Sequence, residues 1–111
     1  MGYIKHHAIV VTTWDTDLVP KLLESAHKMD LEVLCSQPTY VNGYTTIVLC
    51  PDGSKEGWDE SDRGDAARFA FKAWLHTFDY EDGGSPLEWV EVAYGSDDNR
   101  AVVTDDAWWP R

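Results

Sequence analysis

The feature that most constrains the fold is the pair Asn42-Gly43, which stands between the runs TYV and YTTIVLC. Asn and Gly accept the left-handed backbone of a type I′ turn, so this pair predicts a tight hairpin. The strand before it is predicted at residues 31–36, extended through the PTYV run, and the strand after it at 44–50. These two strands should therefore be antiparallel neighbours.

Three further strands and two helices are expected around this hairpin. Residues 3–13 are rich in β-branched and aromatic residues and predict a strand, as do 87–94 and the short run 101–104. Apolar residues spaced by three and four between 18 and 29 predict an amphipathic helix that ends near Asp30. Its N-cap candidates are Asp15, Thr16 and Asp17.

A second helix is predicted after the PDGSKEGW loop, capped by Asp59 or Ser61. The residues expected on its buried side are Ala66, Phe69, Ala70, Ala73, Trp74 and Phe78.

The resulting order, β-α-β-β-α-β-β, predicts an α+β fold. Its natural form is a ferredoxin-like β-α-β-β-α-β plait with an extra C-terminal β-hairpin strand and both helices on one face of the sheet. A chain of 111 residues suits one core, so residues 1–104 are expected to form a single domain. Residues 105–111, DDAWWPR, form an aromatic C-terminal tail that should pack on the domain or on another subunit.

Cys35 and Cys50 lie in apolar, strand-like runs and are expected to be buried, reduced thiols. A disulfide between them would require that their strands be neighbours. The sequence has no apolar signal core at its N-terminus and no run of transmembrane length, which predicts a cytoplasmic protein without a membrane partner.

The charge is strongly negative: 20 acidic residues against 9 basic ones give a formal net charge of -11. This excludes a nonspecific grip on nucleic acid or on an anionic membrane, because both need a basic surface. The segment 79–106 holds nine acidic residues against the single base Arg100. Such an acidic pole fits binding to a basic partner or imitation of DNA, and it also fits simple solubility.

The PDGSKEGW loop is the best candidate for a ligand contact, since it joins a strand to a helix N-terminus, which attracts anions. Ser54 offers a hydrogen bond, Lys55 a charge and Trp58 a stacking face. The other candidate lining residues are Arg63, Tyr44 and His7. Against this site, six acidic residues between 51 and 65 would repel phosphate, and the spacing is not that of a P-loop. A structural turn followed by an acid-rich helix start therefore stays open.

Arg63, Arg68 and Lys72 follow near-helical spacing and either reach an anion or pair with neighbouring acids on the surface. His6 and His7 are adjacent on a strand and point to opposite faces, so they do not form a simple metal pair. No nucleophile, kinase or nuclease signature is present. We expect no metal, no cofactor and no catalytic residue, and an enzyme is the less favoured class.

The segments NGY, PDGSKEGWDESDRGD, FKAWL and WVEVAYG together resemble a family of small proteins encoded by tailed bacteriophages and by prophage regions of bacteria. The resemblance covers roughly residues 3–94, and DGSKEGW is its most specific part, whereas the WWPR tail lies outside it. It carries no activity and no catalytic residue. What it implies is a setting, namely an accessory protein made in the host cell during phage infection.

Three functions follow as hypotheses. The first is a counter-defence protein, expected to be a homo-oligomer, that binds and sequesters a nucleotide-type immune signal of the host without catalysis. The second is an acidic inhibitor or DNA mimic that binds a basic host protein. The third is a small nucleotide-processing enzyme with His6 or His7 as acid and base.

Overall fold

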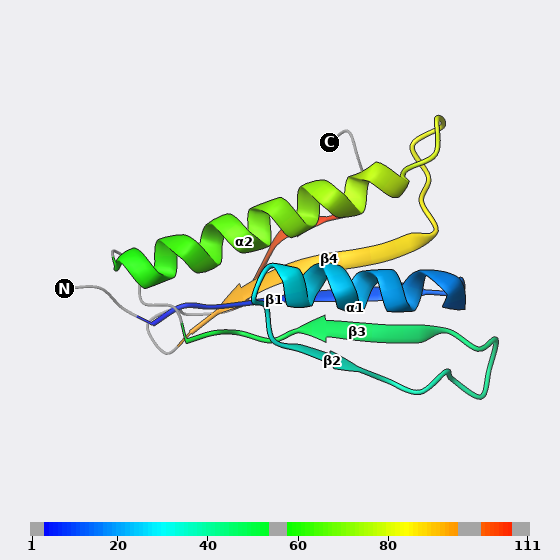
Figure 1. Cartoon of the computed structure of the whole chain (residues 1–111), viewed down its shortest axis with the longest axis horizontal. Coiled ribbons are helices and arrows are strands. Elements are labelled where there is room, and N and C mark those ends of the chain that lie inside the picture. The colour runs from blue at the N-terminus through cyan, green and yellow to red at the C-terminus, as the bar shows by residue number, and fades with distance from the viewer. Residues whose placement is uncertain (1–3, 54–57, 96–100, 108–111) are drawn as a thin grey trace.

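The protein is described here from a computed structural model, which covers residues 4–53, 58–95 and 101–107. These residues form two helices and one five-stranded antiparallel sheet (Figure 1). The strands are β1 (His6–Thr13), β2 (Val33–Cys35), β3 (Thr45–Leu49), β4 (Leu87–Tyr94) and β5 (Val102–Asp106). The helices are α1 (Val19–Lys28) and α2 (Asp59–Leu75), with 3-10 turns at Thr16–Leu18 and His76–Phe78. The predicted α+β class is confirmed.

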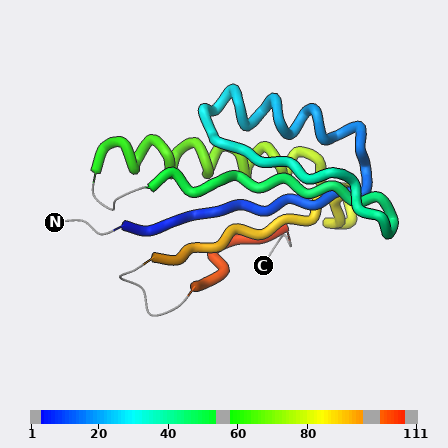
Figure 2. Tube along the Cα trace, turned by 90° about the horizontal axis from the view of Figure 1, so that it is seen from below, coloured from blue at the N-terminus to red at the C-terminus, as the bar shows by residue number. Residues whose placement is uncertain are grey.

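The sheet has the order β2-β3-β1-β4-β5, with β1 at its centre. In the register, Ile9 of β1 lies opposite Leu49 of β3 on one side and Glu91 of β4 on the other. Both helices cover the same face of the sheet, as the two views at right angles show (Figures 1 and 2). Among the described residues, neither helix combines the length and apolarity that crossing a bilayer requires.

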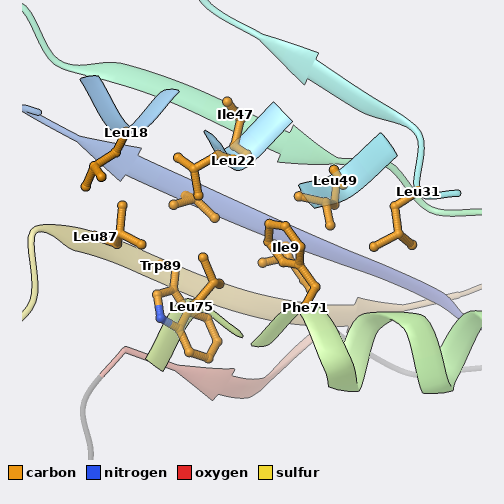
Figure 3. Packing of buried hydrophobic residues seen from close by; sticks show 12 residues of the cluster. Ile9, Leu18, Leu22, Leu31, Ile47, Leu49, Phe71, Leu75, Leu87 and Trp89 are labelled. Carbon is orange, nitrogen blue, oxygen red and sulfur yellow. The ribbon is translucent and has the colours of Figure 1, made fainter. Parts of the chain in front are cut away.

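The core lies between this face and the two helices (Figure 3). Alternate strand positions point inward, such as Ile9 of β1 and Trp89 of β4, because side chains in a strand point to opposite faces in turn. Leu22 closes the core from α1, and Phe71 and Leu75 close it from α2. One hydrophobic cluster therefore joins both helices to the sheet.

The buried face of α2 differs from the prediction. Four residues expected to face the core are exposed: Ala66, Phe69, Ala70 and Ala73. Trp74 and Phe78 do pack against the core, while its centre is filled by Phe71 and Leu75. Phe69 and Phe71 are two positions apart and so lie on opposite sides of a helix, and small alanines do not decide between those sides.

The β2–β3 hairpin forms as predicted, but its loop is wider than two residues. The amide of Thr39 donates to the carbonyl oxygen of Tyr44 at 2.8 Å, which leaves four residues in the loop. Asn42 and Gly43 both have φ of 65°, the left-handed conformation for which they were singled out. The predicted extension of the strand through residues 38–41 is wrong, because Pro38 has no amide hydrogen to pair.

The observed N-caps of the helices agree in part with the predicted ones. The Asp15 carboxylate accepts a hydrogen bond from the Asp17 amide at 3.1 Å, as expected for the cap before the first helix. At α2 the N-cap position belongs to Trp58, whose backbone is extended, rather than to Asp59 or Ser61. β5 continues through Asp106, two residues past the predicted end of the last strand, and residues 108–111 of the predicted tail lie outside the described residues.

The two cysteines are free thiols in neighbouring strand regions. Cys35 is exposed at the end of β2, so the expectation that it is buried is wrong, and Cys50 is half-buried. Cys35 lies opposite Ile47, three residues from Cys50, a separation of about 10 Å along the strand. A disulfide needs Cα atoms closer than about 7 Å, so the register keeps these thiols apart.

The rotation of α2 gives a matched test with one residue type. Phe71 is 0% exposed and Phe69 is 72% exposed, two positions apart on the same helix. Phe71→Ala should lower the free energy of unfolding by about 3–5 kcal/mol, because it opens a cavity in the core. Phe69→Ala should change it by less than about 0.5 kcal/mol. Urea denaturation of the two variants measures the difference, and equal losses would contradict this orientation of α2.

Candidate functional site

A pocket of about 230 Å³ lies between α2 and the sheet, on the side of α2 that carries its charged residues. It is lined by His7 of β1, Glu91 of β4 and four residues of α2: Asp65, Arg68, Phe69 and Lys72. The α2 residues recur at spacings of three and four, which places them along one side of the helix. The pocket therefore joins an imidazole, two cations and two carboxylates.

Arg68 is the most deeply placed cation, with only 4% of its side chain exposed. One guanidinium nitrogen donates to Asp52 Oδ2 at 3.0 Å, and the other donates to the Asp65 carboxylate one helical turn away. Because Asp52 belongs to the segment that follows β3, this fork ties the loop before α2 to the helix. Its two carboxylate partners are 40% and 50% exposed, so water reaches them from outside.

Gly64 makes room for this fork. A Cβ atom at position 64 would lie 2.3 Å from Asp52 Oδ2 and 3.2 Å from the guanidinium of Arg68. Any side chain at this position would push the Asp52 carboxylate away. The glycine thus permits the close approach of the loop to α2.

Lys72, one turn further along α2, is held by acids from two strands. Its ammonium donates to Glu91 Oε1 at 2.8 Å and lies 3.2 Å from Asp105 Oδ2 of β5. The Thr104 hydroxyl also donates to Glu91 Oε1 at 2.8 Å. Glu91 is only 7% exposed, so its charge depends on these partners rather than on water.

Two exposed aromatic side chains flank the charged residues. Phe69 lines the pocket and turns most of its ring to solvent. Trp58 precedes α2 and is also exposed, about 10 Å from Asp65 along the helix axis. Aromatic faces at such a rim offer stacking surface for a flat group.

Of the predicted site residues that the structure describes, only His7 lines this pocket. Trp58 lies at the start of α2, and Arg63 is exposed on the first turns of this helix. Ser54 and Lys55 lie outside the described residues.

Tyr44 is not near this group. It precedes β3, whose first residue Thr45 is level with Thr13, and His7 is six residues further along β1. The separation of Tyr44 from His7 is therefore about 20 Å along the sheet. The two residues mark opposite ends of the domain.

Sequence reasoning missed the acidic half of the site. Arg68 was expected either to reach an anion or to pair with a neighbouring acid at the surface; it pairs with Asp65, but as a buried residue that also binds Asp52. Glu91 left a signal, since in LEWVEVAY it shares the inward-facing alternation of Leu87 and Trp89. A carboxylate that points toward the helices from the sheet needs a cation beside it, because an unpaired buried charge is strongly destabilising.

A larger cavity, of about 430 Å³, lies at the other end of β4 and is lined by Gly83, Gly84, Ser85, Leu87, Glu88, Trp89 and Ala107. Among the residues that the structure describes, the buried indole nitrogen of Trp89 has no hydrogen-bond partner. Within the described residues, no group of three or more His, Cys, Asp or Glu side chains is placed to hold a metal ion.

Comparison of the chain with protein-family models, curated proteins and solved structures gives no match. Function is therefore inferred below from the chemistry of the site.

The buried pair Lys72–Glu91 makes a prediction about stability. Lys72→Met should lower the free energy of unfolding by about 3 kcal/mol, because it leaves the Glu91 carboxylate buried without its cation. Adding Glu91→Gln should recover about 1 kcal/mol or more, since the double variant buries no unpaired charge at this position. Chemical denaturation of both variants and of Glu91→Gln completes the cycle.

The control is the exposed pair Lys28–Glu24 on α1. The hydrogen bond and charge of Lys28 hold the pKa of Glu24 below its usual value, but both side chains are well solvated. Lys28→Met should leave the denaturation midpoint nearly unchanged. A loss from Lys72→Met no larger than that from Lys28→Met would show that the buried pair has no special role.

Proposed function

We propose that this chain is a binding protein that sequesters a small nucleotide-type ligand at the pocket beside α2, without turning it over. The observation that carries the proposal is Arg68, a buried guanidinium whose two partners are both half-exposed carboxylates. A guanidinium fork fits carboxylate and phosphate oxygens equally well.

The phosphate of the ligand would displace a carboxylate that is paired with Arg68, rather than bind a cation that has no partner. Asp65 is the candidate to be displaced, because its carboxylate is half exposed and water can receive it at little cost. Glu91 would stay with Lys72, since it is nearly buried and has Thr104 as a second donor. The exchange keeps Arg68 paired at every stage.

The size of the pocket suits one part of a nucleotide. A volume of about 230 Å³ is below the roughly 300–1,000 Å³ typical of sites that enclose a drug-sized ligand. A phosphate with part of its sugar would fill it, and the base would lie outside on Phe69. Stacking on an exposed aromatic ring contributes roughly 1–3 kcal/mol per base.

The setting comes from the resemblance to tailed-phage and prophage proteins, which suggests an accessory protein acting in the host cytoplasm. We also infer that the fold is a ferredoxin-like plait extended by β5. The strand order β2-β3-β1-β4 with both helices on one face supports this inference. Together these proposals describe a counter-defence protein that removes a host immune signal by binding it.

A thermal-shift screen against cyclic dinucleotides, cyclic trinucleotides, ADP-ribose and inorganic phosphate tests the proposal, because a ligand that binds the native state raises the melting temperature. Phe69→Ala should weaken binding of the nucleotide about tenfold and leave phosphate binding unchanged. Asp65→Asn should strengthen both, since it removes the carboxylate that competes for Arg68. Arg68→Met should abolish both.

The variant Lys55→Ala distinguishes binding at this pocket from binding at the loop before α2. The sequence favoured that loop as the ligand site. Loss of binding in Lys55→Ala with Phe69→Ala unaffected would move the site to the loop. A flat response of the wild-type chain to the whole panel would reject the nucleotide proposal.

A second candidate is an acidic inhibitor of a basic protein, and one observation favours it. Glu81, Asp82 and Glu88 are exposed near one end of the domain, and Glu88 borders the larger cavity. The acidic surface is smaller than the sequence suggests, because Glu91 and Asp105 turn toward Lys72. Binding through three exposed acids would weaken steeply as salt is added.

Charge reversal at matched positions tests this second candidate. Glu81→Lys should reduce capture of a basic partner from bacterial lysate at low salt, whereas Glu24→Lys, the same change on exposed α1, should not. The captured protein should elute as salt is raised. If capture of the basic protein did not depend on salt, or if Glu81→Lys and Glu24→Lys reduced it equally, a role for this acidic end would be contradicted.

A further inference from the structure

The cavity of about 430 Å³ lies at the end of the sheet where β4 begins and β5 ends. Its apolar wall consists of Leu87, Trp89 and Ala107. Gly83 and Gly84 line another part of it and have no side chains that could fill the space. Sites that enclose a small molecule typically measure roughly 300–1,000 Å³, so this cavity is large enough for one.

The indole nitrogen of Trp89 provides a hydrogen-bond donor at this cavity. Only 5% of Trp89 is exposed, and no group among the described residues accepts a hydrogen bond from this nitrogen. In Figure 3 the nitrogen lies on the side of the ring that faces Leu87, another residue of the cavity wall. A buried indole N–H usually has an acceptor, because an unpaired buried donor loses its bond to water without replacing it. The donor is therefore available to an occupant of the cavity.

Contacts with the rest of the domain hold this indole in place. The imidazole of His76 packs against it, with ring centroids 5.3 Å apart and ring planes at 72°. His76 Nδ1 is itself hydrogen-bonded to the Asp79 carboxylate at 2.8 Å. The backbone carbonyl of Trp89 accepts from the Ala107 amide at 3.0 Å, which fixes the strand beside the cavity. Because the ring is packed on these partners, an acceptor has to enter the cavity to reach its nitrogen.

The charged groups near the cavity select against an anionic occupant. The carboxylate of Glu88 is exposed where it lines the cavity, and Glu81 and Asp82 are exposed in the turn that leads to Gly83. Among the described residues, no Lys, Arg or His side chain belongs to the lining. An anion would be repelled here, because like charges raise its energy. An uncharged group with an N–H can instead donate a hydrogen bond to the Glu88 carboxylate.

We propose that this cavity binds a small uncharged cyclic amide, a flat ring in which a carbonyl oxygen stands beside an N–H group. The carbonyl oxygen accepts from Trp89 Nε1, the ring N–H donates to the Glu88 carboxylate, and the ring lies against the apolar wall. A hydrocarbon would leave the indole N–H unpaired, and so would a cation, which offers no lone pair. The cavity shares no lining residue with the pocket beside α2, so this proposal does not depend on the nucleotide proposal.

An NMR titration of the full chain tests the site through the donor itself. The chain has six tryptophans, whose indole N–H groups give separate signals in a ¹H–¹⁵N spectrum, and the variant Trp89→Phe identifies the Trp89 signal by its loss. The probe is 2-pyridone, the smallest aromatic cyclic amide. We expect it to move the Trp89 signal saturably, with a dissociation constant in roughly the millimolar range for a ligand of this size. The indole proton should shift downfield, because a new hydrogen bond deshields it.

Two matched probes separate the two hydrogen bonds of the proposal. N-methyl-2-pyridone keeps the carbonyl oxygen and lacks the N–H, so it should move the same signal but bind about fivefold more weakly. Toluene has a ring of similar size without either group, and it should bind at least about tenfold more weakly than 2-pyridone. Only a cyclic amide satisfies the indole and the carboxylate together.

Variants of the lining complete the test, with binding followed through the backbone amide of Ala107. Trp89→Phe retains an aromatic ring and should weaken 2-pyridone about tenfold, whereas Trp74→Phe, the same change at a tryptophan outside the lining, should not. Glu88→Ala changes an exposed residue and keeps the test valid even if Trp89→Phe proves unstable. It should make 2-pyridone bind as weakly as N-methyl-2-pyridone, and Glu24→Ala on α1 should have no effect. Circular dichroism confirms that each variant is folded.

Three outcomes would overturn the proposal. The first is a Trp89 signal that no probe moves. The second is equal binding of 2-pyridone and toluene, or binding that Trp89→Phe and Glu88→Ala both leave unchanged, which would show that the hydrogen bonds have no role. The third is binding by a chain that ends at Ala107 but not by the full chain, which would assign the cavity to the C-terminal residues of the chain itself.

Discussion

The rotation of α2 about its own axis is the constraint on which the charged site and much of the core depend. Arg68, Phe71, Lys72 and Leu75 lie at positions i, i+3, i+4 and i+7, so one side of the helix carries the central aromatic of the core, the buried Arg68 and the half-buried Lys72. If Phe69 faced the sheet in place of Phe71, the cations would turn toward water. Glu91 would then lie beneath the helix without a positive partner, at a cost of several kcal/mol. Hydrophobic burial and charge pairing therefore favour the same orientation.

The sequence predicted the elements better than it predicted their faces. Strands with strict alternation and a hairpin with Asn42-Gly43 have local signals, because backbone conformation depends on neighbours in the chain. The face of α2 has no such signal, since two phenylalanines point to opposite sides and the alanines around them fit either environment. Its orientation is decided by Glu91 and Asp105, which come from strands that follow α2 in the chain. That information is tertiary and does not appear within any single segment.

The residues of the candidate site also differ in whether the sequence predicts their position. His7 and the segment around Trp58 lie at one end of the domain because β1 starts where β3 ends, which the antiparallel pairing implies. The same pairing puts Tyr44, at the start of β3, at the opposite end, and strand direction alone was enough to separate it from the rest. Asp52 could not be placed from the sequence, because its contact with Arg68 depends on the close approach that Gly64 allows.

The two faces of the sheet differ in physical character. On the helix side, the two cations of the pocket beside α2 are each paired with carboxylates. If the pocket binds an anion as proposed, the anion would compete with these carboxylates, so its affinity would depend on ionic strength. On the opposite face, the register aligns Leu34, Val48, Val10 and Val90 in one apolar row that ends at Asp106. Charge pairing therefore dominates the helix side of the sheet, whereas apolar side chains dominate the other side.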